Sequence, residues 1–445
     1  MHTLSTKFAA ALLSGRTLSD SVTDKAKYCL LDYLASAYST QQFHWVINAR
    51  DMVLQNSGMD NGGAALIGSG KRASLQDAAF VNAVAGHSLV RDDMHLGSVA
   101  HLGVVVIPPA LALAENRSVS GETLLEAIVA GYEAGGKLGR MLMDVQTAKK
   151  IRPTGLIGAW AAAATGSVLL GMDEEQASNA LGLASNYFIG LNEWAAWGSE
   201  DMYFHPGIAV RNGMTAVMLA LQGAKAAATA LEGKAGLFAA LGKHLPKNPL
   251  LPYSDKTEIE QVFFKQVPAC NYAQTAAQVA ALAVADKQVT PDKIKHINIK
   301  VPYAAAHYPG CDFAGPFSSI LHARMSIQFN VASAIINDDF EDSHYQNFTN
   351  KNIASLARKV VVDVDAELTD KYPTRQGAAV TIQYEDQCIN AALDDVIPAS
   401  IKEVNARFLA SAAAYHGQER AVSIQKKTKT LDTIQDLTEY LRLLD

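Results

Sequence analysis

The segment that most constrains the fold is GAWAAAATGSVLLG, residues 158–171, because nearly every side chain in it is small or apolar. A helix that is apolar on every side has to be surrounded by other elements. The chain supplies them from residue 1 to about 250, where Ala, Leu, Met and Gly predominate and apolar positions recur at intervals of three and four. We therefore predict a large helical body built around residues 158–171.

Two further segments illustrate this pattern. Residues 23–39 place apolar side chains on one helix face, and Thr23 fits as the N-cap of that helix. Residues 121–140 predict another helix. We expect this second helix to end at or shortly after the pair Gly135-Gly136, because glycine favours helix ends.

The pattern changes near residue 255, where β-branched and polar residues begin to alternate as they do in strands. The predicted strands lie within residues 292–302, 358–368 and 377–386. Helical patterns separate these segments and return from about residue 398. We therefore predict a mainly α protein with an α+β second domain. The large helical domain covers residues 1–255 and is completed by 398–445, and the smaller α+β lid covers 256–397.

Composition excludes several classes of function. The formal net charge of −6 provides no basic surface, so we expect no nucleic-acid partner. No apolar run approaches the roughly 20 residues of a membrane span, and the four cysteines lack the CxxC spacing of a zinc ribbon. Residues 67–74 lack the first glycine and the final Ser or Thr of a phosphate loop, so we expect no nucleotide cofactor. We therefore expect a cytoplasmic protein that binds a small molecule and no membrane.

The densest polar cluster lies between two apolar segments, at residues 87–101. Its charged and histidine side chains are His87, Arg91, Asp92, Asp93, His95 and His101. An aspartate beside a histidine can orient an imidazole that acts as general base on a carbon-bound proton. The same residues could instead bind a divalent metal, or the aspartates could cap a helix while the histidines bond to backbone carbonyls. Because so many of these residues occur together, we favour a functional role over a purely structural one.

Three other segments carry candidate side chains. Arg152 precedes the central helix, which Pro153 can start, so it is either a carboxylate-binding cation near free helix N–H groups or an ordinary surface arginine. Tyr203 is a candidate proton donor or substrate partner, whereas we interpret the nearby His205 as a structural cap. Arg324 starts a helix in the second domain, where it could clamp a carboxylate or form an internal ion pair.

These segments, in this order, resemble the MmgE/PrpD family of methylcitrate dehydratase-like proteins. The resemblance rests on residues 82–103, 150–171, 196–213, 264–274 and 322–329 and covers nearly the whole chain. It implies a large helical domain and a smaller α/β lid with the active site between them. It also implies a homodimer and a chemistry without cofactor or metal. In that chemistry a proton next to a carboxylate is removed, and water, carbon dioxide or nothing is then lost.

Several polar positions of the family pattern are changed in this chain. The substituted positions are Val90, Arg91, Met94, Arg152, Met202, Gln274 and Phe329. The retained positions are Asp92, Asp93, His95, His101, His205, Lys265 and Arg324. Met94, Met202 and Phe329 make the expected pocket less polar, which suits a larger or less charged substrate than methylcitrate.

The residues and the resemblance together imply a site. Its catalytic set is His101 as base, Asp93 as the partner that orients it, and Tyr203 as proton donor. The expected substrate contacts are Arg91, His95, Arg152, Met202, Lys265, Gln274 and Arg324. We therefore expect a cofactor-independent lyase or isomerase that acts on a small carboxylate or carbonyl compound, with a dehydratase-, decarboxylase-, epimerase- or cyclase-type outcome. The alternatives are a catalytically inactive binding or scaffold protein and a metal hydrolase built on the histidines and aspartates.

Overall fold

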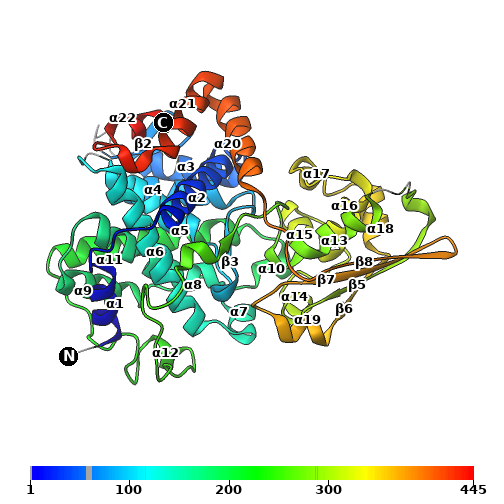
Figure 1. The fold of residues 1–445 in the computed structure, drawn as a ribbon, viewed down its shortest axis with the longest axis horizontal. Coiled ribbons are helices and arrows are strands. Elements are labelled where there is room, and N and C mark those ends of the chain that lie inside the picture. Colours follow the sequence, from blue (N-terminus) through cyan, green and yellow to red (C-terminus); the bar gives the residue numbers. More distant parts are fainter. Residues whose placement is uncertain (1–2, 57–62, 116, 286, 288) are drawn as a thin grey trace.

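The computed structural model describes residues 3–56, 63–115, 117–285, 287 and 289–445 (Figure 1). A large helical body lies on one side of the molecule, and a smaller body that carries a four-stranded sheet lies on the other. This arrangement confirms the predicted fold class, a mainly α protein with an α+β part.

The centre of the helical body is α8 (Pro153–Leu169), which begins at Pro153 and has Arg152 as its N-cap. All of its side chains except that of Val168 are buried. It contacts α5 (Gly103–Ala114), α6 (Gly121–Leu142), α9 (Glu174–Ala184) and α11 (Asp201–Leu221). The helix that is apolar on every side is thus enclosed by other helices, as its sequence predicts.

Two helix boundaries differ from the prediction. Helix α2 (Asp20–Ser39) begins before Thr23, and the side chain of Ser19 caps it by accepting a hydrogen bond from a backbone N–H. Helix α6 continues past the glycine pair. A Cβ at Gly136 would lie 2.6 Å from a carboxylate oxygen of Glu258, so this glycine makes room for a buried side chain and does not end the helix.

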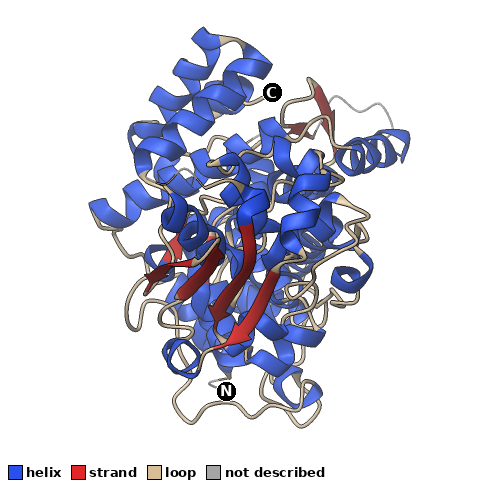
Figure 2. Ribbon diagram, turned by 90° about the vertical axis from the view of Figure 1, so that its right-hand side faces the viewer, coloured by secondary structure: helices blue, strands red, loops and turns tan. Residues whose placement is uncertain are grey.

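The second body is built on a sheet with the strand order β6-β5-β7-β8 (Figure 2). The strands are β5 (Ile294–Val301), β6 (Val360–Val364), β7 (Ala378–Tyr384) and β8 (Gln387–Leu393). Strands β5 and β6 are parallel, and the other pairs are antiparallel. Helices α13 (Gln274–Val284) and α16 (Ile327–Asn337) pack against the sheet. The first three strands lie within predicted segments, whereas the sequence did not predict β8.

The remaining elements complete the two bodies. In the helical body these are α1 (Leu4–Leu12), α3 (His44–Asn56), α4 (Leu75–His87), α7 (Val145–Lys150), α10 (Trp194–Trp197), α12 (Leu237–Ala240), β1 (Ala64–Leu66), β2 (Lys71–Ala73) and β3 (Met94–His95). Further along the chain are β4 (Val262–Phe263), α14 (Tyr303–His307), α15 (Ile320–Met325), α17 (Ser343–Gln346), α18 (Lys351–Ala357) and α19 (Ala366–Lys371). The 3₁₀ helices are η1 (Leu96–Ser98), η2 (Glu258–Gln261), η3 (Asn271–Ala273), η4 (Pro291–Lys293) and η5 (Leu431–Thr433).

The chain returns to the helical body after the sheet. Helices α20 (Ile401–His416), α21 (Gln418–Lys429) and α22 (Thr438–Leu443) follow β8, and α20 packs against α2. Figure 1 shows these last helices, in orange and red, beside the blue helices from the start of the chain. Across the described ranges, no helix has both the length and the apolar character needed to cross a membrane.

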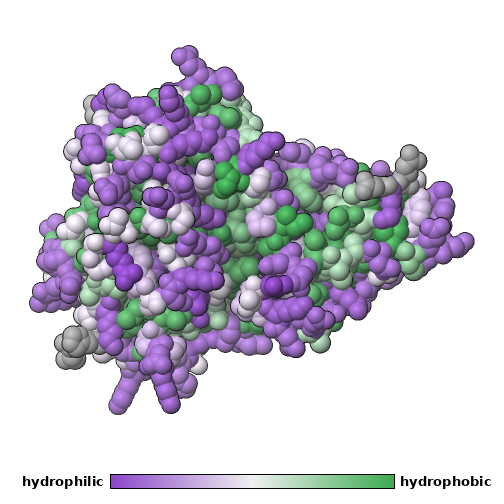
Figure 3. Space-filling view, in the orientation of Figure 1, coloured by the Kyte–Doolittle hydropathy of each residue, from purple (hydrophilic) through white to green (hydrophobic). Residues whose placement is uncertain are grey.

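A short antiparallel pairing joins β3 of the helical body to β4. Strand β3 belongs to the predicted polar cluster, and β4 lies on the segment that leads into the second body. Figure 3 shows apolar surface gathered at the waist between the bodies. The fold therefore brings the polar cluster to the junction.

Candidate active site

Residues 88–102 link α4 to α5 and run along the junction. Val90 and Val99 in this segment have φ angles of 55° and 53°, in the left-handed region. This conformation is rare for β-branched residues, costs about 1–3 kcal/mol and is found mainly at functional sites. Both valines face a cavity, so the strained backbone forms part of its wall.

The cavity has a volume of about 40 Å³ and lies between this segment, the start of α8 and the second body. Its apolar lining includes Val90, Met94, Val99, Trp194, Met202 and Met325. Its polar lining includes His101, Arg152, Thr154, Cys270, Asn271 and Tyr308. An apolar pocket into which a few polar groups converge is typical of a site for a small molecule.

Asp92 lies at the centre of the polar cluster, where its carboxylate meets two imidazoles. Its Oδ2 is 2.9 Å from Nδ1 of His87 and 3.1 Å from Nδ1 of His101. Because an ionised carboxylate only accepts hydrogen bonds, both Nδ1 atoms carry the hydrogen. The neutral form of His101 therefore has its lone pair on Nε2, at the cavity wall.

Arg152 is held by the other imidazole. Its Nη2 lies 2.5 Å from Nε2 of His87, and a guanidinium only donates, so His87 accepts this hydrogen bond and is neutral. The guanidinium carbon also lies 5.2 Å from the ring centroid of Trp194, a cation–π contact. Nε of Arg152 has no hydrogen-bond partner within the described part of the chain. This buried donor is therefore available to an anionic ligand.

Burial and neighbouring charges determine the protonation of this cluster. Burial lowers the pKa of His87 to about 3 despite the opposing effect of Asp92, so His87 is neutral near pH 7. Burial alone would raise the pKa of Asp92, but the imidazoles of His101 and His87 outweigh it and hold this pKa below its ordinary value. Burial also lowers the pKa of Arg152, although a guanidinium keeps its charge. The site thus combines the buried Asp92 carboxylate, which lies behind the two imidazoles, with the Arg152 guanidinium at the cavity wall.

The structure corrects the expected role of Asp93. Its carboxylate does not meet His101, because Oδ1 accepts a hydrogen bond of 3.0 Å from the backbone N–H of Gly103 and Oδ2 accepts one from the Tyr132 hydroxyl. Asp93 thereby anchors the start of α5, and only its backbone carbonyl meets His101, by accepting a hydrogen bond of 3.1 Å from Nδ1. The chain bends at Asp92, and the Asp92 carboxylate is the one that faces the imidazole.

The expected proton donor Tyr203 and the expected clamp Arg324 lie outside the cavity wall, although Met202 is part of it. The ring of Tyr203 stacks on Trp45 with centroids 4.1 Å apart, and its hydroxyl accepts a hydrogen bond of 3.4 Å from Arg324. Arg324 also lies 2.5 Å from a carboxylate oxygen of Asp342 and donates to a backbone carbonyl of the helical body. Of the two expectations for Arg324, the structure supports the internal ion pair.

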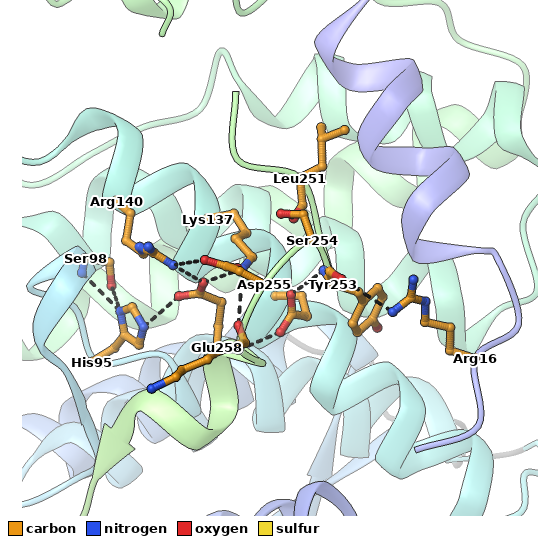
Figure 4. Close-up of polar contacts among 12 residues, drawn as sticks. Arg16, His95, Ser98, Lys137, Arg140, Leu251, Tyr253, Ser254, Asp255 and Glu258 are labelled. Carbon is orange, nitrogen blue, oxygen red and sulfur yellow. Dashed lines mark hydrogen bonds and ion pairs between the residues drawn. The ribbon is translucent and has the colours of Figure 1, made fainter. Parts of the chain in front are cut away.

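His95, another expected substrate contact, belongs to a buried charged network outside the cavity (Figure 4). Its Nε2 lies 2.8 Å from one oxygen of Glu258, and Lys137 and Arg140 each lie 2.8 Å from the other oxygen. Nδ1 of His95 accepts a hydrogen bond of 3.0 Å from the backbone N–H of Ser98. Burial would raise the pKa of Glu258, but these contacts lower it to about 2. The network ties the polar segment to the chain entering the second body.

Lys265, Gln274 and Arg91 are not part of the cavity wall. Lys265 donates a hydrogen bond of 2.8 Å to the carbonyl of Ala269, and burial lowers its pKa to about 8. Gln274 donates to the carbonyl of Val267 at 2.8 Å and accepts from its N–H at 3.1 Å, so it braces the same segment. Arg91 faces a separate hollow of about 770 Å³.

The metal-hydrolase alternative can be tested on His87, Asp92 and His101, whose possible ligand atoms lie within 4.8 Å of one another. Both nitrogens of His87 are already engaged, one by Asp92 and the other by Arg152. The guanidinium would also repel a divalent cation at this distance. These side chains are therefore better arranged for hydrogen bonds to one another than for binding a metal ion.

Several side chains that the sequence did not assign to the site also reach the cavity, among them Trp194, Cys270, Asn271 and Tyr308. Asn192 positions two of them, because it accepts a hydrogen bond of 3.0 Å from Trp194 and donates one of 3.1 Å to the Tyr308 hydroxyl. Cys270 and Asn271 lie in a segment that carries the family resemblance, which is the signal that could have found them.

Comparisons with known proteins agree with this architecture. The MmgE/PrpD N-terminal domain matches residues 6–249, and the MmgE/PrpD C-terminal domain matches residues 267–433. The cis-aconitate decarboxylase of Homo sapiens is 26% identical over 475 residues, which cover 100% of this chain and 95% of that protein. The cis-aconitate decarboxylase of Mus musculus is 24% identical over 96% of this chain and 90% of that protein. That of Aspergillus terreus (strain NIH 2624 / FGSC A1156) is 22% identical over 98% and 94%.

Proposed function

Because this chain belongs to the MmgE/PrpD family, we propose that it is a cofactor-independent lyase or isomerase that removes a proton next to a carboxylate. Its relatives are cis-aconitate decarboxylases, which are lyases and act on a substrate other than methylcitrate. The observation that carries the proposal is the orientation of His101. Nδ1 faces two acceptors, the carbonyl of Asp93 and the carboxylate of Asp92, each at 3.1 Å, so Nε2 is left as a base at the cavity.

Arg152 has the complementary role in this proposal. Removing a proton next to a carboxylate places negative charge on the substrate oxygens, and a fixed cation stabilises that charge without reorganising. His87 fixes the guanidinium, and the free Nε donor of Arg152 can meet a substrate carboxylate. A purely binding or scaffolding protein would not require this coupled arrangement of base and cation.

The cavity favours a substrate with little charge. Arg152 is the cation of its wall, and most of the remaining lining is apolar or aromatic. A volume of about 40 Å³ has room for about three water molecules. We therefore propose a small carboxylate with an apolar part as the substrate. A tricarboxylate would require the side chains or the two bodies to move apart.

The test is a product assay with cis-aconitate and a set of smaller mono- and dicarboxylates, followed by proton NMR. We expect at least one of these to be converted by the wild-type protein and by the Glu439→Gln variant, which changes an exposed ion pair. The His101→Gln variant should convert it at least about 100-fold more slowly, the usual contribution of a general base. Conversion at the wild-type rate by His101→Gln would contradict the proposal.

A further inference from the structure

Cys270 is a side chain of the cavity wall to which the proposed function assigns no role. It precedes η3 in the part of the chain that follows β4, whereas His101 precedes α5 in the helical body. The thiol and the imidazole thus reach the same cavity from different bodies. A substrate carbon held between them can exchange protons with both groups.

Cys311 lies behind Cys270 and positions its thiol. The two sulfur atoms are 3.6 Å apart, and Cys311 is fully buried outside the cavity wall. The hydrogen bond from Cys311 is the main cause that lowers the pKa of Cys270, and the backbone N–H of Tyr272 adds a second one. Burial raises the pKa of Cys311, so Cys311 keeps its proton and acts as the donor.

The charged groups around Cys270 act in the same direction. The titratable groups that face it are Arg152, Lys265, Tyr272, Tyr308, Cys311 and Tyr372. The arginine and the lysine are cations and favour a thiolate. Burial raises the pKa of each of the three tyrosines, so they are neutral and add no opposing charge near pH 7.

We propose that Cys270 is the second acid–base residue of this site and that the substrate is a carboxylate whose reacting carbon lies between Cys270 and His101. This assignment rests on the proposed function and extends it. It assigns the site to proton transfer at two faces of one carbon, which is the chemistry of an isomerase.

The step balances without a further reactant. Nε2 of His101 takes the proton from the carbon next to the carboxylate, and the electron pair of that C–H bond forms an enolate beside Arg152. The S–H of Cys270 then gives its proton to the same carbon, and its electron pair stays on sulfur as a thiolate. One C–H bond breaks and another forms. The resulting imidazolium and thiolate return to the starting state by proton exchange with solvent or by the reverse reaction.

The first test needs no substrate and measures thiolate absorbance near 240 nm as a function of pH. We compare wild-type protein with Cys270→Ser and with Cys388→Ser, which removes an exposed thiol. The part of the wild-type absorbance that is missing in Cys270→Ser comes from Cys270, and the part missing in Cys388→Ser comes from Cys388. The Cys270 signal should appear at a lower pH than the Cys388 signal. Cys311→Ala should move the Cys270 midpoint upward, and Cys311→Ser, which keeps a donor, should move it less. A Cys270 midpoint at or above that of Cys388 overturns the assignment.

The second test counts deuterons that enter the methylene group of but-3-enoate in heavy water; this small monocarboxylate has an apolar part and a methylene group between its carboxylate and its double bond. Wild-type protein should place two deuterons on this carbon, whereas Cys270→Ser should place one, because only His101 remains to exchange. Equal labelling by both proteins overturns the assignment. If wild-type protein exchanges neither hydrogen, the proposed function fails for this substrate, and the absorbance titration still decides whether Cys270 is the low-pKa thiol.

Discussion

Asp92→Asn is the substitution that most sharply separates the roles of the two adjacent aspartates. The introduced amide would keep the shape of the side chain but remove the charge shared by His87 and His101, whose Nδ1 atoms lie at 2.9 and 3.1 Å from the Asp92 carboxylate. An amide oxygen has two lone pairs and can take the place of Oδ2, but it carries no negative charge. Nδ1 of His101 also keeps the Asp93 carbonyl as an acceptor, at 3.1 Å. The imidazolium that forms when His101 takes a proton would therefore lose its carboxylate partner, which makes His101 a weaker base.

The expected magnitude follows from the two hydrogen bonds. A hydrogen bond to a charged group contributes about 1.5–3 kcal/mol, and a neutral one about 0.5–1.5 kcal/mol. Replacing two charge-assisted bonds by two neutral ones should therefore lower the free energy of unfolding by about 2–3 kcal/mol. Turnover should fall by a factor of about 10² to 10⁴, the usual contribution of a general base.

The assay combines urea denaturation, turnover of the substrate found by the product assay, and nitrogen NMR of the histidine rings, which reports the tautomer. Asp93→Asn is the matched control, because the Asp93 carboxylate meets Gly103 and Tyr132 and does not meet His101. We expect the control to keep the Nδ1–H tautomer of His101 and to lose less activity than Asp92→Asn. Equal losses in the two variants, or a larger loss in Asp93→Asn, would refute the reasoning.

Three further predictions address the cation, the buried network and pH. Arg152→Met should raise the dissociation constant of the substrate by about 10- to 100-fold in calorimetry, since it removes a charge-assisted contact of about 1.5–3 kcal/mol, whereas Lys149→Met should change it little. Glu258→Gln should lower the free energy of unfolding by about 1.5–3 kcal/mol, because His95, Lys137 and Arg140 lose a charged partner although Asp255 still pairs with the two cations, whereas the exposed Glu439→Gln should change it by less than about 1 kcal/mol. The pKa of His87 is lowered to about 3, so stability should fall as the pH drops below about 6.5 towards that value, and His87→Gln should flatten this dependence in denaturation series.

The sequence predicted much of the fold because periodicity reports which faces are buried. Helix α8 and strands β5 to β7 follow from such patterns. Strand β8 did not, because its residues are exposed or only half-buried and include no run of β-branched side chains. Helix α6 continues past its glycine pair, because Gly136 leaves space for the side chain of Glu258 and Gly135 leaves space for those of Leu102 and Ala161. These close approaches come from tertiary packing and are not visible in local sequence.

The sequence predicted part of the candidate site for a similar reason. The clustering of His87, Asp92 and His101 along the chain and the position of Arg152 before a helix indicated that these groups serve a common site. The choice between Asp92 and Asp93 depends on backbone direction within a strained segment, which local patterns do not encode. His95 was misplaced because its partner network comes from α6 and the segment that leads to β4, distant in sequence.

The most direct test of the central claim is solvent deuterium exchange by protein treated with a metal chelator. We expect the wild-type protein to label the carbon next to a substrate carboxylate and His101→Gln to do so at least about 100-fold more slowly. Labelling by His101→Gln at the wild-type rate, or labelling that disappears with the chelator and returns with a divalent metal, would contradict the assignment of His101 as the base.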